Sequence, residues 1–130
     1  MYIPVGGARP IIANTVLHNP GYLNCDGGGA VPVSYSGNFA SDTTCALTDT
    51  FDQQGPGLDP LLGPPQSASL TNGTAYYPPL AGSPLINNAQ GVVPCSTLDQ
   101  ILATRPDACD IGAVEYRGLL PRLYLPLVLK

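Results

Sequence analysis

Proline and glycine recur along the whole chain, and they limit the secondary structure that it can form. The 130 residues include 15 prolines and 15 glycines. A proline inside a helix removes a backbone hydrogen bond and clashes with the preceding turn, so long helices are disfavoured. Yet 44% of the residues are hydrophobic, which is more than a disordered chain carries. The sequence therefore predicts one all-β domain with short strands and many turns.

Charge and hydropathy argue against two classes of interaction. The net charge is −4, and the four arginines are scattered along the chain. Nucleic-acid binding requires a basic patch, so we expect no nucleic-acid partner. No apolar run reaches the length of about 18 residues that a membrane span needs, so we expect no transmembrane segment. The first residues lack the pattern of a signal peptide, so an exported chain would be a mature form or a fragment.

The four cysteines favour disulfides over a metal site. They are Cys25, Cys45, Cys95 and Cys109, with no Cys-x-x-Cys spacing, and the single His18 is distant from them in sequence. We therefore expect no metal and no other cofactor. Three pairings are possible. The sequential one, Cys25–Cys45 and Cys95–Cys109, is favoured because each of these pairs encloses its own Gly- or Pro-rich loop. Disulfides persist outside the reducing cytosol, so we expect a secreted or cell-surface protein.

Short apolar segments, separated by turn residues, recur roughly 20 to 25 residues apart. This spacing is closer to the coils of a parallel β-helix than to the strands of a sandwich, which stays open as the alternative. A further segment, 98–103, reads as one or two helical turns before Arg105-Pro106. The expected strands or rungs are 10–19, 30–36, 58–63, 83–88 and 111–116.

Several motifs together resemble a known family. They are Ile-Ala-Asn-Thr-Val at 12–16, Cys-Ala-Leu at 45–47, Asp-Pro-Leu-Leu-Gly at 59–63, Gly-Ser-Pro-Leu-Ile-Asn at 82–87 and Cys-Asp-Ile-Gly-Ala-Val-Glu-Tyr at 109–116. Their order is similar to that in the C-terminal region of secreted right-handed parallel β-helix proteins, the choice-of-anchor Q type. The resemblance covers residues 11–116. It implies a short right-handed solenoid with long loops and a disulfide-stapled C-terminal cap.

The resemblance also suggests a division of the chain and an open end. Residues 1–10 form an N-terminal extended arm, 11–116 the β-helix domain, and 117–130 an apolar C-terminal tail or strand. In the family further coils precede this region, so the N-terminal side is expected to present an unpaired strand edge. An apolar strand with proline can pair along such an edge, in the same copy or in another. The candidate inter-subunit residues are Tyr2, Ile3, Val5, Tyr124, Leu125, Leu127 and Val128.

The acidic and aromatic residues have structural interpretations, and we expect no catalytic residue. Asp59 and Asp110 are expected in turns or caps, and Asp49 and Asp52 in a solvated loop. Arg105 is expected to pair at the surface with Asp99, Asp110 or Glu115, which contributes little to stability. Further candidates are Asp42 and Asp107 as loosely clustered acids, His18 as a turn residue, Tyr76 and Tyr77 on opposite sides of a strand, and Asn72 in a glycosylation sequon.

The expected function is that of a non-enzymatic extracellular structural or adhesive protein. Open solenoid edges and terminal strands would join copies head-to-tail into a filament. The alternative is a C-terminal fragment of a carbohydrate-active β-helix protein, either polysaccharide-binding or lyase-like. The expected partners are copies of the chain, other surface proteins or a polysaccharide.

Overall fold

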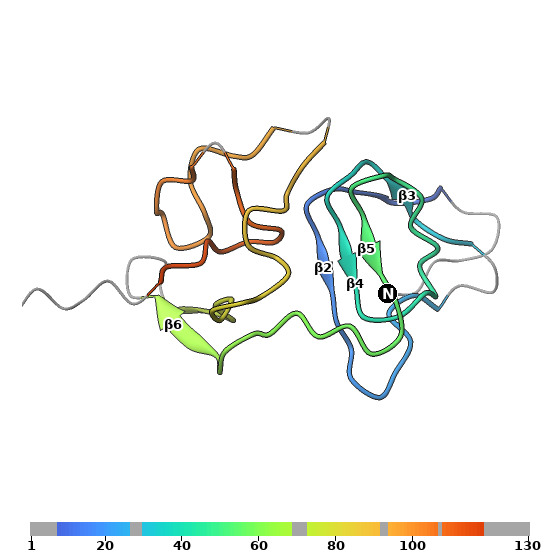
Figure 1. Cartoon of the computed structure of the whole chain (residues 1–130), viewed down its shortest axis with the longest axis horizontal. Helices are drawn as coiled ribbons and strands as arrows, with labels where there is room; N and C mark the ends of the chain where they lie inside the picture. Colours follow the sequence, from blue (N-terminus) through green and yellow to red (C-terminus); the bar gives the residue numbers. More distant parts are fainter. Residues whose placement is uncertain (1–7, 27–29, 69–72, 92–93, 107, 119–130) are drawn as a thin grey trace, which may run out of the picture.

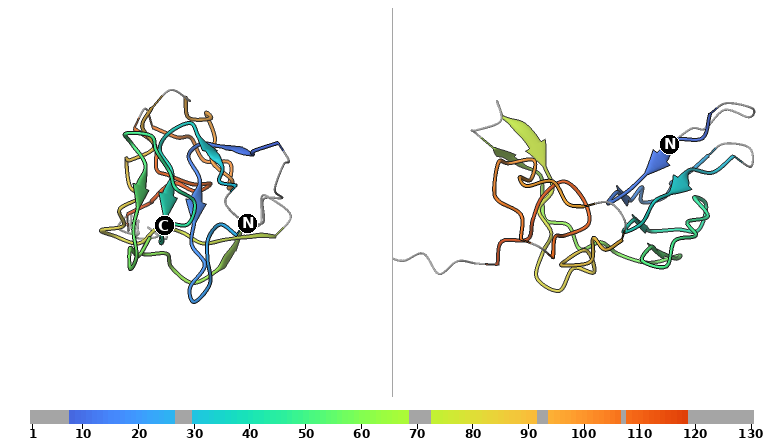
Figure 2. Two further views of the ribbon diagram at one scale, coloured as in Figure 1. Left: turned by 90° about the vertical axis from the view of Figure 1, so that its right-hand side faces the viewer. Right: turned by 90° about the horizontal axis from the view of Figure 1, so that it is seen from above.

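A computed structural model describes residues 8–26, 30–68, 73–91, 94–106 and 108–118. Within them the fold is all-β, as predicted, and contains no helix. Strands β1–β5 gather at one end of the molecule, and the loops of the C-terminal half gather at the other (Figure 1). A second view along another axis shows the same two groups side by side (Figure 2). The strands are β1 (Ile11–Ile12), β2 (Val16–Leu17), β3 (Val33–Ser34), β4 (Phe39–Ala40), β5 (Gln53–Gln54), β6 (Gln66–Ala68) and β7 (Thr74–Tyr76).

The five N-terminal strands pair in parallel. β1 pairs with β3, and β2, β4 and β5 form a three-stranded sheet in that order. Val16 lies opposite Phe39, and Phe39 lies opposite Gln53. The chain thus returns to the same place in successive passes, and each pass hydrogen-bonds to the one before it. The strands expected in 10–19 and 30–36 are confirmed.

A sharp corner separates β1 from β2. Asn14 has a φ of 47°, in the left-handed region that asparagine tolerates better than most residues. The Asn14 N–H donates to the Ser36 carbonyl at 3.1 Å, and the Thr15 N–H donates to Asn38 Oδ1 at 3.0 Å. The segment that reads as one strand in the sequence is therefore two strands joined by a hydrogen-bonded corner.

The C-terminal half differs from the sequence prediction. The expected rungs 83–88 and 111–116 are turns and bends, and 58–63 contributes only the antiparallel bridge between Leu62 and Pro79. β6 and β7 form an antiparallel hairpin. In 83–88 the bonds from Ile86 to Ser83 and from Asn88 to Leu85 are turn bonds, and a single long-range backbone bond joins the Ile111 N–H to the Leu85 carbonyl at 2.9 Å. Short apolar runs mark buried positions without distinguishing turn from strand, which is why this prediction was wrong.

The expected helical turns at 98–103 do not form a helix either. Leu98 and Thr104 are joined by an isolated antiparallel bridge, and the residues between them make a turn. The Asp99 carboxylate accepts hydrogen bonds from the backbone of Ile101 and Ala103, at 3.0 and 2.8 Å. An aspartate that binds the backbone just beyond itself favours a turn over a helix.

The three-stranded sheet separates two small cores. On one face Leu17 and Ala40 pack with the Cys25–Cys45 disulfide and Leu47. On the other face Phe39, which is fully buried, packs with Leu85 and Ile111 of the C-terminal half. Val16, Leu62 and Ala89 surround that second core. The sheet is therefore covered on both faces, and Phe39 is the central contact between the two halves.

Both disulfides form in the sequential pairing that the sequence favours. Cys25 pairs with Cys45, and Cys95 pairs with Cys109. The Ala89 N–H donates to the Cys109 carbonyl at 3.0 Å, so the second disulfide is attached to the segment that packs on Phe39. In the chain-entropy model each such loop contributes about 3 kcal/mol to stability.

Gly112 lies at one of the contacts between the two halves. Its N–H donates to the Asn14 carbonyl at 3.0 Å, and its φ is 107°. A Cβ at this position would lie 3.1 Å from Val16 Cγ2. Both the backbone conformation and the close approach to β2 therefore favour glycine here.

We predict that Phe39→Ala destabilises the fold by about 3 to 5 kcal/mol, because it leaves a cavity between the halves. The matched control is Phe51→Ala, since Phe51 is 45% exposed and should lose about 1 kcal/mol or less. Urea denaturation of both variants measures the difference. Equal losses would show that the sheet does not depend on the packing of the C-terminal half.

Candidate functional site

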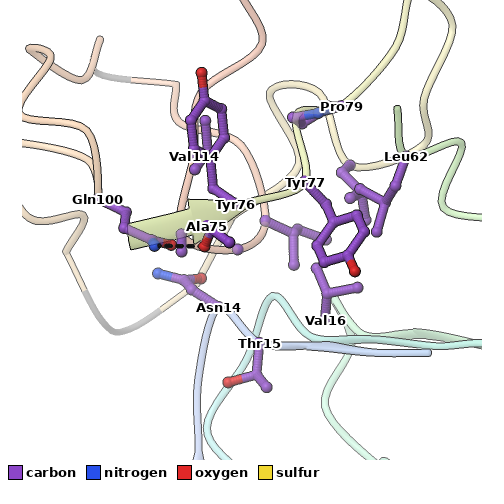
Figure 3. A pocket seen from close by; sticks show the side chains of 14 residues that line it. Asn14, Thr15, Val16, Leu62, Ala75, Tyr76, Tyr77, Pro79, Gln100 and Val114 are labelled. Atoms are coloured by element: carbon purple, nitrogen blue, oxygen red, sulfur yellow. Dashed lines mark hydrogen bonds between the residues drawn. The ribbon is translucent and has the colours of Figure 1, made fainter. Parts of the chain in front are cut away.

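A groove runs beside β2, between the sheet and the C-terminal half. Two hollows, of about 470 and 560 Å³, share Val16, Leu62 and Tyr77 in their linings and so adjoin. Figure 3 shows the hollow of about 470 Å³, with Thr15 and Val16 on one side and the segment of Ala75 to Tyr77 on the other. We call the two hollows together the β2 groove.

The groove exposes the unpaired edge of β2. The carbonyls of Thr15 and Leu17 accept hydrogen bonds from Phe39 and Ser41 of the next pass, at 2.9 and 3.1 Å. Because alternate residues of a strand point their polar groups to opposite sides, the N–H and C=O of Val16 point away from β4. Among the described residues neither group has a hydrogen-bond partner.

The walls of the groove are mainly apolar. Leu62, Tyr77 and Pro79 line one side, and Ile111 and Val114 line the other. Among the residues that line the two hollows there is no Asp, Glu, Lys or Arg. An apolar groove beside an unpaired strand edge is suited to bind an extended, uncharged segment of polypeptide.

Gln100 connects the two walls. Its backbone N–H donates to the Ala113 carbonyl at 2.7 Å, and its side-chain Nε2 donates to the Ala75 carbonyl at 3.2 Å (Figure 3). Through its backbone and its side chain, Gln100 thus joins the segment after the second disulfide to strand β7.

Behind the groove, Arg105 holds the loop that supplies its second wall. Nη1 of Arg105 lies 2.6 Å from Oε1 of Glu115, and both side chains are only 7% exposed. The guanidinium also donates to the carbonyls of Asp110 and Gly112, at 3.2 and 2.6 Å. The predicted pairing of Arg105 with Glu115 is confirmed, but its predicted position at the surface was wrong, because the loop folds over the arginine and excludes water from it.

Two buried aspartates bind backbone groups from several loops. Asp99 Oδ2 accepts the Glu115 N–H at 3.2 Å, in addition to the turn bonds described above. Asp110 accepts the backbone N–H of Asn87 at 2.8 Å and that of Tyr116. Asp110 therefore has a structural role, but it joins separate loops and does not stabilise a local turn or cap. Both carboxylates are occupied as cross-links between loops.

The environment of Glu115 changes its protonation. Burial raises the pKa of the Glu115 carboxyl, and the neighbouring negative charges of Asp110 and Asp99 raise it further. The backbone N–H of Asp110 and the charge of Arg105 act in the opposite direction without cancelling the increase. The protonated form of Glu115 is therefore favoured by folding.

Asp49 and Asp52 are half-buried and belong to a second hydrogen-bond network, whereas a solvated loop was predicted. Asp52 accepts hydrogen bonds from the Ser34 hydroxyl and the Asn38 backbone, at 2.5 and 3.0 Å. Asp49 accepts one from the Ser36 hydroxyl at 2.8 Å. Polar groups in successive passes must find partners away from water, and these two carboxylates supply them.

The other predicted residues are dispersed. Asp59 accepts the Leu61 N–H in a turn, as expected, and His18 is an exposed residue near Asn19 and Pro20. Tyr76 donates its hydroxyl to Gln66, and both Tyr76 and Tyr77 line the groove. In the described part of the chain no cluster of ligands could hold a metal. Asn72, Asp107, Tyr2, Ile3, Val5, Tyr124, Leu125, Leu127 and Val128 lie outside the described residues.

Comparisons with protein-family models, with curated proteins and with solved structures find no match to this chain. The β-helix resemblance therefore stays an expectation from the motifs. The described residues contain no helix of the length and apolarity needed to span a membrane. Sequence reasoning did not find the groove, because its lining comes from separate segments and no local pattern marks it.

We predict that Arg105→Met costs about 3 to 5 kcal/mol of stability, since it leaves a buried carboxylate without its partner. Arg117→Met is the matched control. The Arg117 guanidinium is 49% exposed and lies 3.7 Å from Asp99, so its loss should cost less than about 1 kcal/mol. Guanidinium denaturation of both variants measures this, and equal losses would contradict a buried role for Arg105.

We also predict opposite pH dependences at two carboxylates. Because folding raises the pKa of Glu115, its contribution to stability is present below its unfolded pKa and is lost as pH rises through the folded value. At Asp42 burial raises the pKa, but hydrogen bonds from Thr44 and Asn24 outweigh it and lower the pKa. That contribution is present above the unfolded pKa and is lost as pH falls through the folded value.

Unfolding free energies across the acidic range measure both effects. In the wild type, Glu115 should make stability decrease with rising pH, and Glu115→Gln should remove that decrease. Asp42 should make stability increase with rising pH, and Asp42→Asn should remove that increase. A pH profile of Glu115→Gln that is parallel to the wild-type profile would contradict the first assignment.

Proposed function

We propose that this chain is a non-enzymatic, extracellular structural protein whose copies join through open strand edges into filaments. In this proposal the stacked passes are the coils of a short right-handed parallel β-helix. The parallel pairing of β1 with β3, and of β2 with β4 and β5, supports that architecture. The two disulfides support an extracellular location, because such bonds persist in oxidising environments.

The observation that carries this proposal is that both outer strands of the main sheet have an unpaired edge. On β2 the edge is at Val16. On β5 the N–H groups of Gln53 and Gly55 donate to the carbonyls of Asn38 and Ala40, so the polar groups of Gln54 point outward. Among the described residues the backbone of Gln54 has no partner on that side.

Two different open edges favour a heterologous contact. A contact between unlike surfaces of identical subunits produces a ring if it closes and a filament if it does not. Natural sheets usually block exposed edges with charges, prolines or a covering loop. The residues at these two edges, Val16 and Gln54, are uncharged. The edges are therefore suited to pair with further polypeptide.

The carboxylates support a structural role for the acidic residues. Asp99, Asp110 and Glu115 are buried and bind backbone groups or Arg105. Glycoside hydrolysis requires two carboxyl groups facing a substrate across a bond. Carboxylates that are occupied in holding loops together are poorly suited to that chemistry.

We predict that the purified chain self-associates in a concentration-dependent manner, as measured by sedimentation velocity, with filaments visible by electron microscopy. Gln54→Pro should weaken this association more than Gln54→Ala does. Both variants lose the side-chain bonds to Leu47, but only proline removes the outward N–H.

A chain that remains monomeric at every concentration would contradict the proposal. So would equal association of the two Gln54 variants, since the β5 edge would then play no part. Turnover of a polysaccharide by the purified chain would overturn its non-enzymatic character.

A further inference from the structure

Residues 119–130 follow the last described residue and have the composition of an edge-binding strand. Between Arg122 and Lys130 the chain reads Leu-Tyr-Leu-Pro-Leu-Val-Leu, seven residues without a charge. We propose that this apolar segment, 123–129, of one copy adds as a strand to β2 of a second copy and fills the β2 groove. The inference rests on the proposed function and identifies the contact that joins the copies.

The length and chemistry of the segment fit the groove. Seven extended residues span about 23 Å, and the groove comprises two adjoining hollows that share Val16, Leu62 and Tyr77. The lining has no charged residue that would be left unpaired by an apolar occupant. In this mode of recognition the strand edge supplies hydrogen bonds, and the hollows accept alternate side chains.

Pro126 sets which residues can pair with β2. In an added strand, alternate residues point their N–H and C=O groups toward the edge, in either strand orientation. Proline has no N–H, so Pro126 must point its nitrogen away from β2. The residues beside it, Leu125 and Leu127, then present their polar groups to the N–H and C=O of Val16. The position of Pro126 thus predicts which alternate set of residues hydrogen-bonds to β2, namely the set that contains Leu125 and Leu127.

The exit point of the chain favours a second copy as the receiver. The last described residues, in red, lie on the side of the C-terminal half that faces away from β2 (Figures 1 and 2). To reach β2 of its own copy, the segment must reverse after Gly118 and retrace the length of that half. A copy placed end to end receives the segment without a reversal. Repetition of this contact is heterologous and continues along a fibre.

The test compares two pairs of proline substitutions in the full-length chain. L125P/L127P removes the two N–H groups that the proposal directs toward β2. Y124P/V128P is the matched control, because it also adds two prolines but leaves both of those groups in place. We expect L125P/L127P to weaken self-association at least about tenfold in sedimentation experiments, and Y124P/V128P to weaken it less.

A synthetic peptide of residues 119–130 provides a second measurement. Added to the wild-type chain, it should compete for the β2 groove and shift assemblies toward monomers, whereas the same peptide with both leucines at 125 and 127 replaced by proline should not. On the receiving side, Tyr77→Asp should weaken association. Tyr22→Asp is its control, since Tyr22 is 78% exposed and lines neither of the two hollows of the groove.

The outcomes separate this inference from the proposed function. If the chain assembles but L125P/L127P associates as strongly as the wild type, the segment is not the occupant, and the proposed function stands. If the segment is protected from proteolysis in a dilute monomer, it binds in its own copy and the contact between copies is overturned. If the chain never assembles, both proposals are overturned.

Discussion

Backbone polar groups must be paired in a fold that has few strands, and this constraint explains much of the structure. Strands of two or three residues form few ladder bonds. Side-chain acceptors take their place. Asp99 and Asp110 bind backbone groups from several loops, and Asp52 binds those of neighbouring passes. Buried N–H groups without partners would be costly, so these carboxylates define the loop conformations as much as the apolar core does.

The sequence predicted the features that depend on composition and local chemistry. Proline and glycine predicted short strands, the loops between neighbouring cysteines favoured the correct disulfide pairing, and Asp59 was correctly assigned to a turn. It could not predict features that depend on which segments meet. The burial of Arg105 arises because a loop ten residues later folds over it, and no local pattern encodes that contact.

The position of the C-terminal half shows the same limit. The motifs suggested further rungs stacked in line with the first ones, but Leu85 and Ile111 pack against Phe39 on one face of the sheet. This packing covers the sheet and leaves its two edges unpaired within the described residues. The groove is therefore a product of how the halves meet, since β2 supplies the edge and the second half supplies the walls.

The two disulfides also determine how the molecule would respond to a pulling force. Strands β3 and β4 lie inside the loop closed by Cys25 and Cys45, and the second disulfide closes a loop in the other half. Tension applied along the chain bypasses both loops, so the residues within them cannot be drawn out. A subunit under load would lengthen only through its remaining segments and would retain its central strand in a covalently closed loop.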